Sequence, residues 1–217
     1  MKYSHKNCGE TIVEVMIATV LLVTVLASAF VSLNRATQTN VNVQNRIVAI
    51  NLAREGMEAV RNIRDTNWLK YSGNKREKWL CLDSVSNLNE CAGSGSSTKM
   101  TDGFYQVNFS ETKSRYFLVN IASSQELDIP NASAGLESFR LYLDATTQKF
   151  THNSGTNPPT PFYRQIELDV ATDEVCGAAC NEEKLKVTVR VGWIEKNVSK
   201  NVTLETHLFD FYQRDAY

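Results

Sequence analysis

The first third of the chain lacks the residues that break helices. From Glu10 to Trp68 there is no proline, and the only glycine is Gly56. Proline removes a helical hydrogen bond, and glycine costs about 1 kcal/mol per helical position relative to alanine. This stretch is therefore predicted to form one uninterrupted helix. Its weakest part is Asn34 to Asn42, because Thr and Asn are poor helix formers.

An excess of charge of either sign is also missing. The chain has 23 Lys and Arg against 24 Asp and Glu, a net charge of −1. A near-neutral chain gives no electrostatic indication of nucleic-acid binding. No nucleophile elbow, P-loop or His-Glu-x-x-His motif occurs in the sequence. We therefore expect no enzyme activity, no cofactor and no nucleic-acid partner.

Recognisable metal motifs are absent too. Cys176 and Cys180 are separated by three residues rather than the two typical of zinc motifs. Asp169, Asp173 and Glu174 lack the spacing and glycine of an EF-hand loop. His152 and His207 have no ligand-like neighbours in sequence, so no metal site is expected. Four Asn-x-Ser/Thr sites are expected by chance in a chain this rich in these residues: Asn108, Asn131, Asn197 and Asn201.

What the chain does contain is one apolar run of membrane-spanning length. From Ile12 to Leu33 only Glu14, two threonines and two serines are not apolar. Such a run can cross a bilayer as a helix. A carboxylate in hydrocarbon costs about 2.5 kcal/mol or more, which marks Glu14 as a functional residue that needs a partner.

The start of the chain resembles the class III signal of type IV prepilins. That signal is a short basic leader ending in glycine, with Glu as the fifth residue after the cut. Here Lys2 and Lys6 precede Gly9, and Glu14 is the fifth residue after it. Two further segments are similar to minor pilins of the PilV type: residues 51–68 and the closing pair of strands, residues 187–193 and 202–209.

This resemblance implies a specific processing and assembly route. Prepilin peptidase would cut between Gly9 and Glu10, and Glu14 would pair with a neighbouring subunit's new amino group during filament assembly. Most such proteins carry an N-methylated Phe as the first mature residue, and Glu10 departs from that pattern. The implied partners are other pilin subunits, the assembly platform and the cytoplasmic membrane.

The implied location is a single-pass membrane protein that is later drawn into an extracellular pilus. Positive charge before the span places the N-terminus in the cytoplasm. Two alternatives stay open. The protein could be a pseudopilin of a type II secretion or competence system, or an adhesin-like binding domain, secreted or anchored, that does not polymerise. The triplet Ala27-Ser28-Ala29 also fits ordinary signal peptidase, which would leave Phe30 as the first residue of a secreted protein.

Four of the five cysteines lie on the exported side, where disulfides persist. They are Cys81, Cys91, Cys176 and Cys180, and three connectivities are possible. We favour Cys81–Cys91 and Cys176–Cys180, because each pair brackets a short, turn-rich segment. Cys8 belongs to the leader and would be lost with it.

Periodicity changes beyond the membrane run. Apolar residues that step by three or four predict a buried helical stripe: Val43, Ile47, Ile50, Ala53, Met57, Val60 and Ile63. Residues 71–102 and 153–161 are predicted to be loops. Alternating runs predict strands at residues 104–109, 115–121, 139–144, 162–171, 184–194 and 201–209. Trp68, Trp79 and Trp193 are expected to lie in the core or to anchor loops.

Together these patterns predict an α+β protein with a pilin-like arrangement. A long N-terminal helix packs its second half against a C-terminal antiparallel sheet. The expected divisions are a leader at 1–9, a transmembrane half-helix at 10–34, an amphipathic half-helix at 35–70 and a β-rich head at 71–217. In the sheet, the odd-numbered face of residues 185–193 is expected to pack on the helix.

Overall fold

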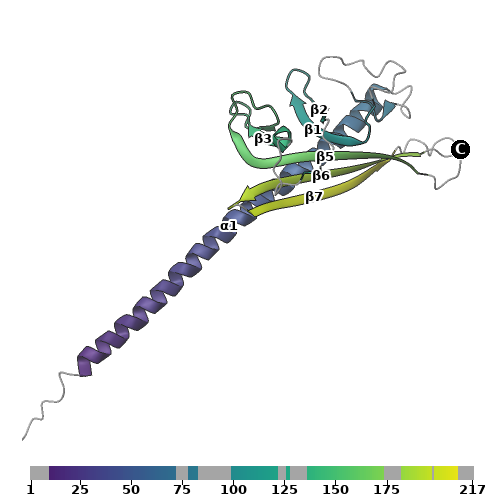
Figure 1. The fold of residues 1–217 in the computed structure, drawn as a ribbon. Coiled ribbons are helices and arrows are strands. Elements are labelled where there is room, and N and C mark those ends of the chain that lie inside the picture. The colour runs from purple at the N-terminus through teal and green to yellow at the C-terminus, as the bar shows by residue number, and fades with distance from the viewer. Residues whose placement is uncertain are drawn as a thin grey trace, which may run out of the picture. The chain divides into compact units, whose positions relative to one another are not determined.

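The computed structural model describes residues 10–71, 78–82, 99–121, 126–127, 136–173, 182–196 and 198–209. The chain divides into two compact units, residues 1–47 and residues 48–217. One helix, α1, runs from Glu10 to Lys70 and contributes to both units (Figure 1). The prediction of a single long N-terminal helix is therefore confirmed, including the Thr- and Asn-rich stretch from Asn34 to Asn42, which is helical.

Within its described residues, the second unit contains a seven-stranded sheet in which every strand pair is antiparallel. Its strands are β1 (Gly103–Ser110), β2 (Arg115–Ile121), β3 (Arg140–Leu143), β4 (Phe150–Thr151), β5 (Pro159–Asp173), β6 (Glu182–Glu195) and β7 (Val198–Phe209). A short 3-10 helix, η4 (Leu136–Phe139), precedes β3. Strand β5 is central, because it pairs with β1, β3 and β6, and β6 pairs in turn with β7.

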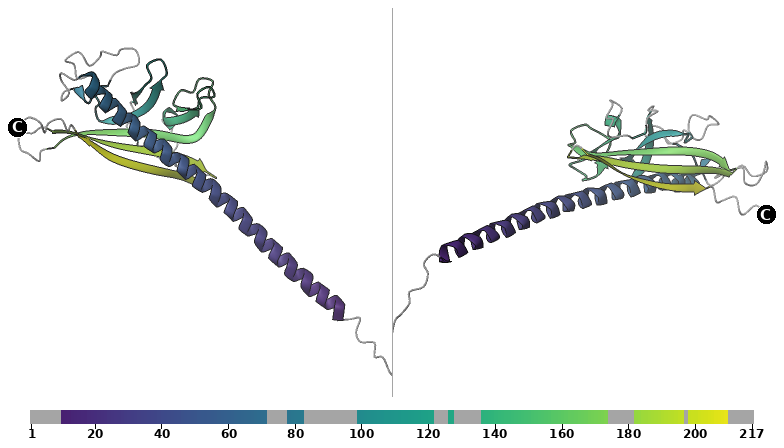
Figure 2. Two further views of the ribbon diagram at one scale, coloured as in Figure 1. Left: turned by 180° about the vertical axis from the view of Figure 1, so that it is seen from behind. Right: turned by 60° about the horizontal axis from the view of Figure 1, so that its bottom comes forward.

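Residues 48–70 of α1 pack against one face of this sheet (Figure 2). The odd-numbered residues of β6 are buried in the same core as the helix, as the alternation predicted: Leu185, Val187, Val189, Val191 and Trp193. Gly56 permits the close approach of the two elements. A Cβ atom added to Gly56 would lie 3.0 Å from Cγ1 of Val189. The α+β fold class predicted from the sequence is the one observed.

The buried helical face differs from the predicted stripe. Ala53, Val60 and Ile63 are buried, whereas Val43 and Ile47 are exposed. The residues that fill the core from α1 are Ala49, Leu52, Ala53, Ala59, Val60, Ile63 and Trp68. Small alanines occupy much of this face because a sheet packs close to the helix there. The predicted stripe was chosen by hydrophobicity and spacing, so it included the large apolar side chains of Val43 and Ile47 and left out the alanines at 49 and 59.

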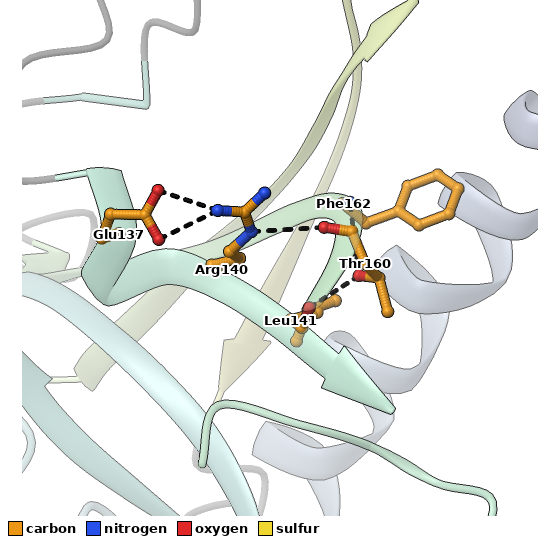
Figure 3. Close-up of polar contacts among 5 residues, drawn as sticks. All are labelled: Glu137, Arg140, Leu141, Thr160 and Phe162. Carbon is orange, nitrogen blue, oxygen red and sulfur yellow. Dashed lines mark hydrogen bonds and ion pairs between the residues drawn. The ribbon is translucent and has the colours of Figure 1, made fainter. Parts of the chain in front are cut away.

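The loop predicted at residues 153–161 ends earlier than expected. Strand β5 already begins at Pro159 and includes Pro161, so the prediction is wrong for residues 159–161. Proline cannot donate to a β-ladder, and the register between β3 and β5 shifts there. The hydroxyl of Thr160 compensates, as Figure 3 shows. It donates to the carbonyl oxygen of Leu141 at 2.7 Å and accepts from the backbone N–H of Phe162 at 3.3 Å.

Arg140 supports the same irregularity from β3 (Figure 3). Its Nε donates to the carbonyl oxygen of Thr160 at 3.4 Å, and its Nη1 pairs with both carboxylate oxygens of Glu137 at 3.0 and 3.2 Å. The guanidinium also lies 5.4 Å from the ring centroid of Tyr163. Side chains therefore hold β3 against β5 where the prolines interrupt backbone pairing.

Part of the predicted loop at 71–102 packs into the core and is hydrogen-bonded to the last turns of α1. Trp79 and Leu80 are buried, and Cys81 forms an isolated antiparallel bridge with Lys99. Trp68 and Trp193 are buried as well, so all three tryptophans lie in the core, as expected. The strand predicted at residues 115–121 is observed with the same bounds, and the other predicted strands are present with changed ends. The two-residue strand β4 was not predicted.

Candidate functional site

The candidate site is the apolar part of α1 around Glu14. In the described part of the chain, one helix is long and apolar enough to cross a membrane. The side chain of Glu14 is exposed, and so are its apolar neighbours Val13 and Val15. Within the described residues Glu14 has no hydrogen bond or ion pair. Its carboxylate therefore lies on a surface that is otherwise suited to lipid or to another apolar helix.

The other polar groups of this segment differ from Glu14 in being satisfied locally. Each of four hydroxyls donates to a carbonyl of its own helix: Thr19 to Met16 at 2.9 Å, Thr24 to Leu21 at 2.8 Å, Ser28 to Val25 at 2.8 Å and Ser32 to Ser28 at 2.9 Å. Hydroxyls bonded in this way add little cost to burial in an apolar environment. Glu14 is consequently the side chain of the segment that needs a partner from outside its helix.

The residues of the predicted cleavage site are only partly described. Gly9 and Cys8 lie outside the described residues, and α1 begins at Glu10. The side chain of Glu10 is not among those described.

Cys81 is disulfide-bonded. Hydrogen bonds from α1 fix the backbone on both sides of Leu80. The Nδ2 group of Asn67 donates to the carbonyl oxygens of Trp79 at 3.0 Å and of Cys81 at 2.8 Å. Cys91, Cys176 and Cys180 lie outside the described residues, so the pairing of the exported cysteines stays a prediction.

An ion pair between a buried arginine and a partly exposed glutamate, which the sequence analysis missed, connects α1 to the sheet. Arg164 on β5 is 1% exposed, and its Nη1 lies 2.9 Å from Oε2 of Glu55. The same guanidinium donates to the carbonyl oxygens of Leu52 at 3.4 Å and of Val107 at 3.3 Å. Burial lowers the pKa of Arg164, and the carboxylate of Glu55 opposes that shift. The sequence did carry a signal for this pair. The even-numbered residues at 162, 166, 168 and 170 are apolar, and Arg164 interrupts them with a charge on the face predicted to be buried.

The search for a metal site covers the described part of the head. Within the described residues no group of three His, Cys, Asp or Glu side chains could hold a metal ion. The Nδ1–H group of His152 donates to the carbonyl oxygen of Arg140, 3.1 Å away, and its Nε2 is buried. Burial, reinforced by the charge of Arg164, lowers the pKa of His152 to about 3. His207 lies 3.5 Å from Glu205 at the surface of β7.

The other residues singled out in sequence occupy unremarkable positions. Asp169 is exposed on β5, and Glu174 lies outside the described residues. Asn108 accepts a hydrogen bond from the backbone of His152 at 3.2 Å, which gives its side chain a structural role. Asn201 is exposed on β7, while Asn131 and Asn197 lie outside the described residues.

Comparison with known proteins adds no assignment. No family model, no curated protein and no solved structure matches the chain.

Proposed function

We propose that this protein is a structural subunit of a type IV pilus, a minor pilin that assembles through its N-terminal helix. The observation that carries the proposal is the position of Glu14. It is an exposed carboxylate on an apolar helical surface, five residues after Gly9. Its exposed apolar surroundings are compatible with a bilayer before assembly and with other apolar helices afterwards.

The electrostatics of assembly follow from that position. Cleavage after Gly9 creates an amino group on Glu10, only four residues from Glu14. Burying either charge alone among apolar helices is costly, and pairing them removes most of that cost. If the amine of one subunit meets Glu14 of the next, the pair sets the axial register between subunits. The head then remains outside the helical core.

The test is Glu14→Ala, with Thr19→Ala as a matched control in the same segment. Removing the carboxylate takes a costly group out of the span, so insertion into the membrane is expected to be unaffected or slightly easier. Incorporation into filaments is expected to fall about tenfold or more, because the amine of the neighbouring subunit loses its partner. The measurement is immunoblotting of membrane and sheared-filament fractions.

The outcomes separate the proposal from its alternatives. Glu14→Ala protein that enters filaments as well as the parent would contradict the assigned role of the carboxylate. Parent protein that stays in the membrane and never appears in any filament would favour an anchored binding domain. Thr19→Ala should behave like the parent, because the Thr19 hydroxyl is bonded within its own helix.

A further inference from the structure

Two strands share one edge of β5, and the change from one to the other falls at Arg164. Strand β1 pairs with the later part of β5, as far as the pair Tyr105 and Ile166. Strand β3 pairs with the earlier part, where Arg140 lies opposite Tyr163. Figure 1 shows β1 and β3 one after the other along β5. In the described sheet, the two residues of β5 between these ladders belong to neither, and Arg164 is the first of them.

Polar groups connect the strands at this junction in place of backbone pairing. The Nη2 group of Arg164 donates to the carbonyl oxygen of Val107 on β1 at 3.3 Å. The backbone N–H of His152 donates to Oδ1 of the next residue, Asn108, at 3.2 Å. The ring Nδ1–H of His152 donates to the carbonyl oxygen of Arg140 on β3 at 3.1 Å. His152 therefore connects β1 to β3 beside the point where Arg164 connects β5 to β1.

Each of these two side chains has one nitrogen left over. Within the described residues, Nε of Arg164 and Nε2 of His152 are buried and make no hydrogen bond. Arg164 is almost fully buried, and although part of His152 reaches the surface, its Nε2 atom does not. Buried polar atoms in proteins are nearly always paired, either with protein or with ordered water. Two such atoms at one junction therefore indicate a partner that is not a side chain of the described residues.

The two nitrogens define the chemistry of that partner. The Nε–H of arginine can only donate, and with the ring proton of His152 on Nδ1 its Nε2 can only accept. The ring is neutral at neutral pH, because burial and then the nearby charge of Arg164 lower the pKa of His152 to about 3. The partner must accept from Arg164 and donate to His152. Water does both, whereas a chloride ion only accepts and a metal cation does neither.

We propose that the junction of β1, β3 and β5 is a buried water site, in which ordered water accepts from Nε of Arg164 and donates to Nε2 of His152. A buried water typically makes about three hydrogen bonds to groups that have no other partner. Water at this place completes the connection between strands where the backbone ladders stop. The inference concerns the head alone and does not depend on the proposed function.

The first test is a crystal structure of the full-length protein in detergent, at a resolution that locates ordered water. We expect solvent oxygen about 2.7–3.2 Å from Nε of Arg164 and from Nε2 of His152. Solvent at only one of the two nitrogens, or at neither, would overturn the proposal, and so would another side chain of the protein in contact with either. Crystals grown in bromide provide the control for an anion, because an anomalous signal at the junction would overturn the assignment to water.

The second test counts long-lived water molecules in solution by the magnetic relaxation dispersion of water ¹⁷O. His152→Phe keeps a ring but removes the acceptor, and His207→Phe makes the same change at the surface of β7. We expect at least one fewer long-lived water in His152→Phe than in the parent, and the parent number in His207→Phe. Equal numbers in the parent and His152→Phe would contradict the site. If His152→Phe does not fold, the crystal structure of the parent decides alone.

Discussion

The side-chain amide of Asn67 lies 2.8 Å from the carbonyl oxygen of Cys81. A second hydrogen of the same amide reaches the carbonyl oxygen of Trp79 at 3.0 Å. Asn67 is 3% exposed, so both bonds are shielded from water. One residue near the end of α1 thereby fixes the segment that carries the disulfide-bonded Cys81.

Replacement of Asn67 should destabilise the head. Asn67→Ala leaves two buried carbonyl groups without their donor, which is expected to cost about 2–3 kcal/mol of unfolding free energy. Asn67→Asp should cost more at neutral pH, because a carboxylate would face two carbonyl oxygens. Urea unfolding of the full chain in detergent, followed by tryptophan fluorescence, measures the change. Asn62→Ala is the control, since Asn62 is exposed; an equal loss there would contradict the argument.

The pair formed by Arg164 and Glu55 predicts a strongly non-additive double mutant. Glu55→Gln leaves a buried guanidinium without its counter-charge and should cost about 3 kcal/mol. Arg164→Met alone should cost less, because Glu55 is 34% exposed and can be hydrated. The double variant should be more stable than the sum of the single losses indicates.

The same unfolding experiment tests this non-additivity, with Glu58→Gln as the surface control that should cost less than about 1 kcal/mol. Additive losses would show that the two residues do not interact.

These two sites show what the sequence could and could not predict. Breaker-free composition predicted α1 through backbone propensity, and alternation predicted most strands through burial of one face, because both are local properties of the sequence. Arg164 was missed because its partner Glu55 is 109 residues away, and no local pattern links them. The start of β5 at Pro159 was missed for a similar reason. Proline argues against a strand, and the hydroxyl of Thr160 that compensates acts across to β3.

His152 predicts a loss of stability in acid. Its pKa in the folded protein is about 3, below the ordinary value of 6.5. As pH falls below about 6.5 the unfolded chain binds a proton that the folded protein does not, so His152 destabilises the fold progressively down to about pH 3. The slope is at most about 1.4 kcal/mol per pH unit. Above about pH 7 the residue contributes no pH dependence.

The measurement is the unfolding free energy of parent and His152→Gln at several pH values between 4 and 8. As pH falls, the unfolding free energy of the parent should decrease relative to that of His152→Gln, because Gln does not titrate. His207→Gln changes a surface position on β7 and is the matched control. A parent-minus-variant difference that is constant over this range would contradict the buried, neutral imidazole.

The mature N-terminus decides whether the Gly9 signal is used. Mass spectrometry of protein from the membrane is expected to find Glu10 as the first residue, since the signal that the chain resembles is cut after its glycine and this cut leaves Glu14 in the product. Gly9→Val should leave the longer form in the membrane, because the resemblance assigns the peptidase a requirement for glycine. A first residue of Phe30 would show cleavage after Ala29 by ordinary signal peptidase. That product lacks Glu14 and most of the apolar run, so neither the carboxylate nor the apolar helix would be available for filament assembly.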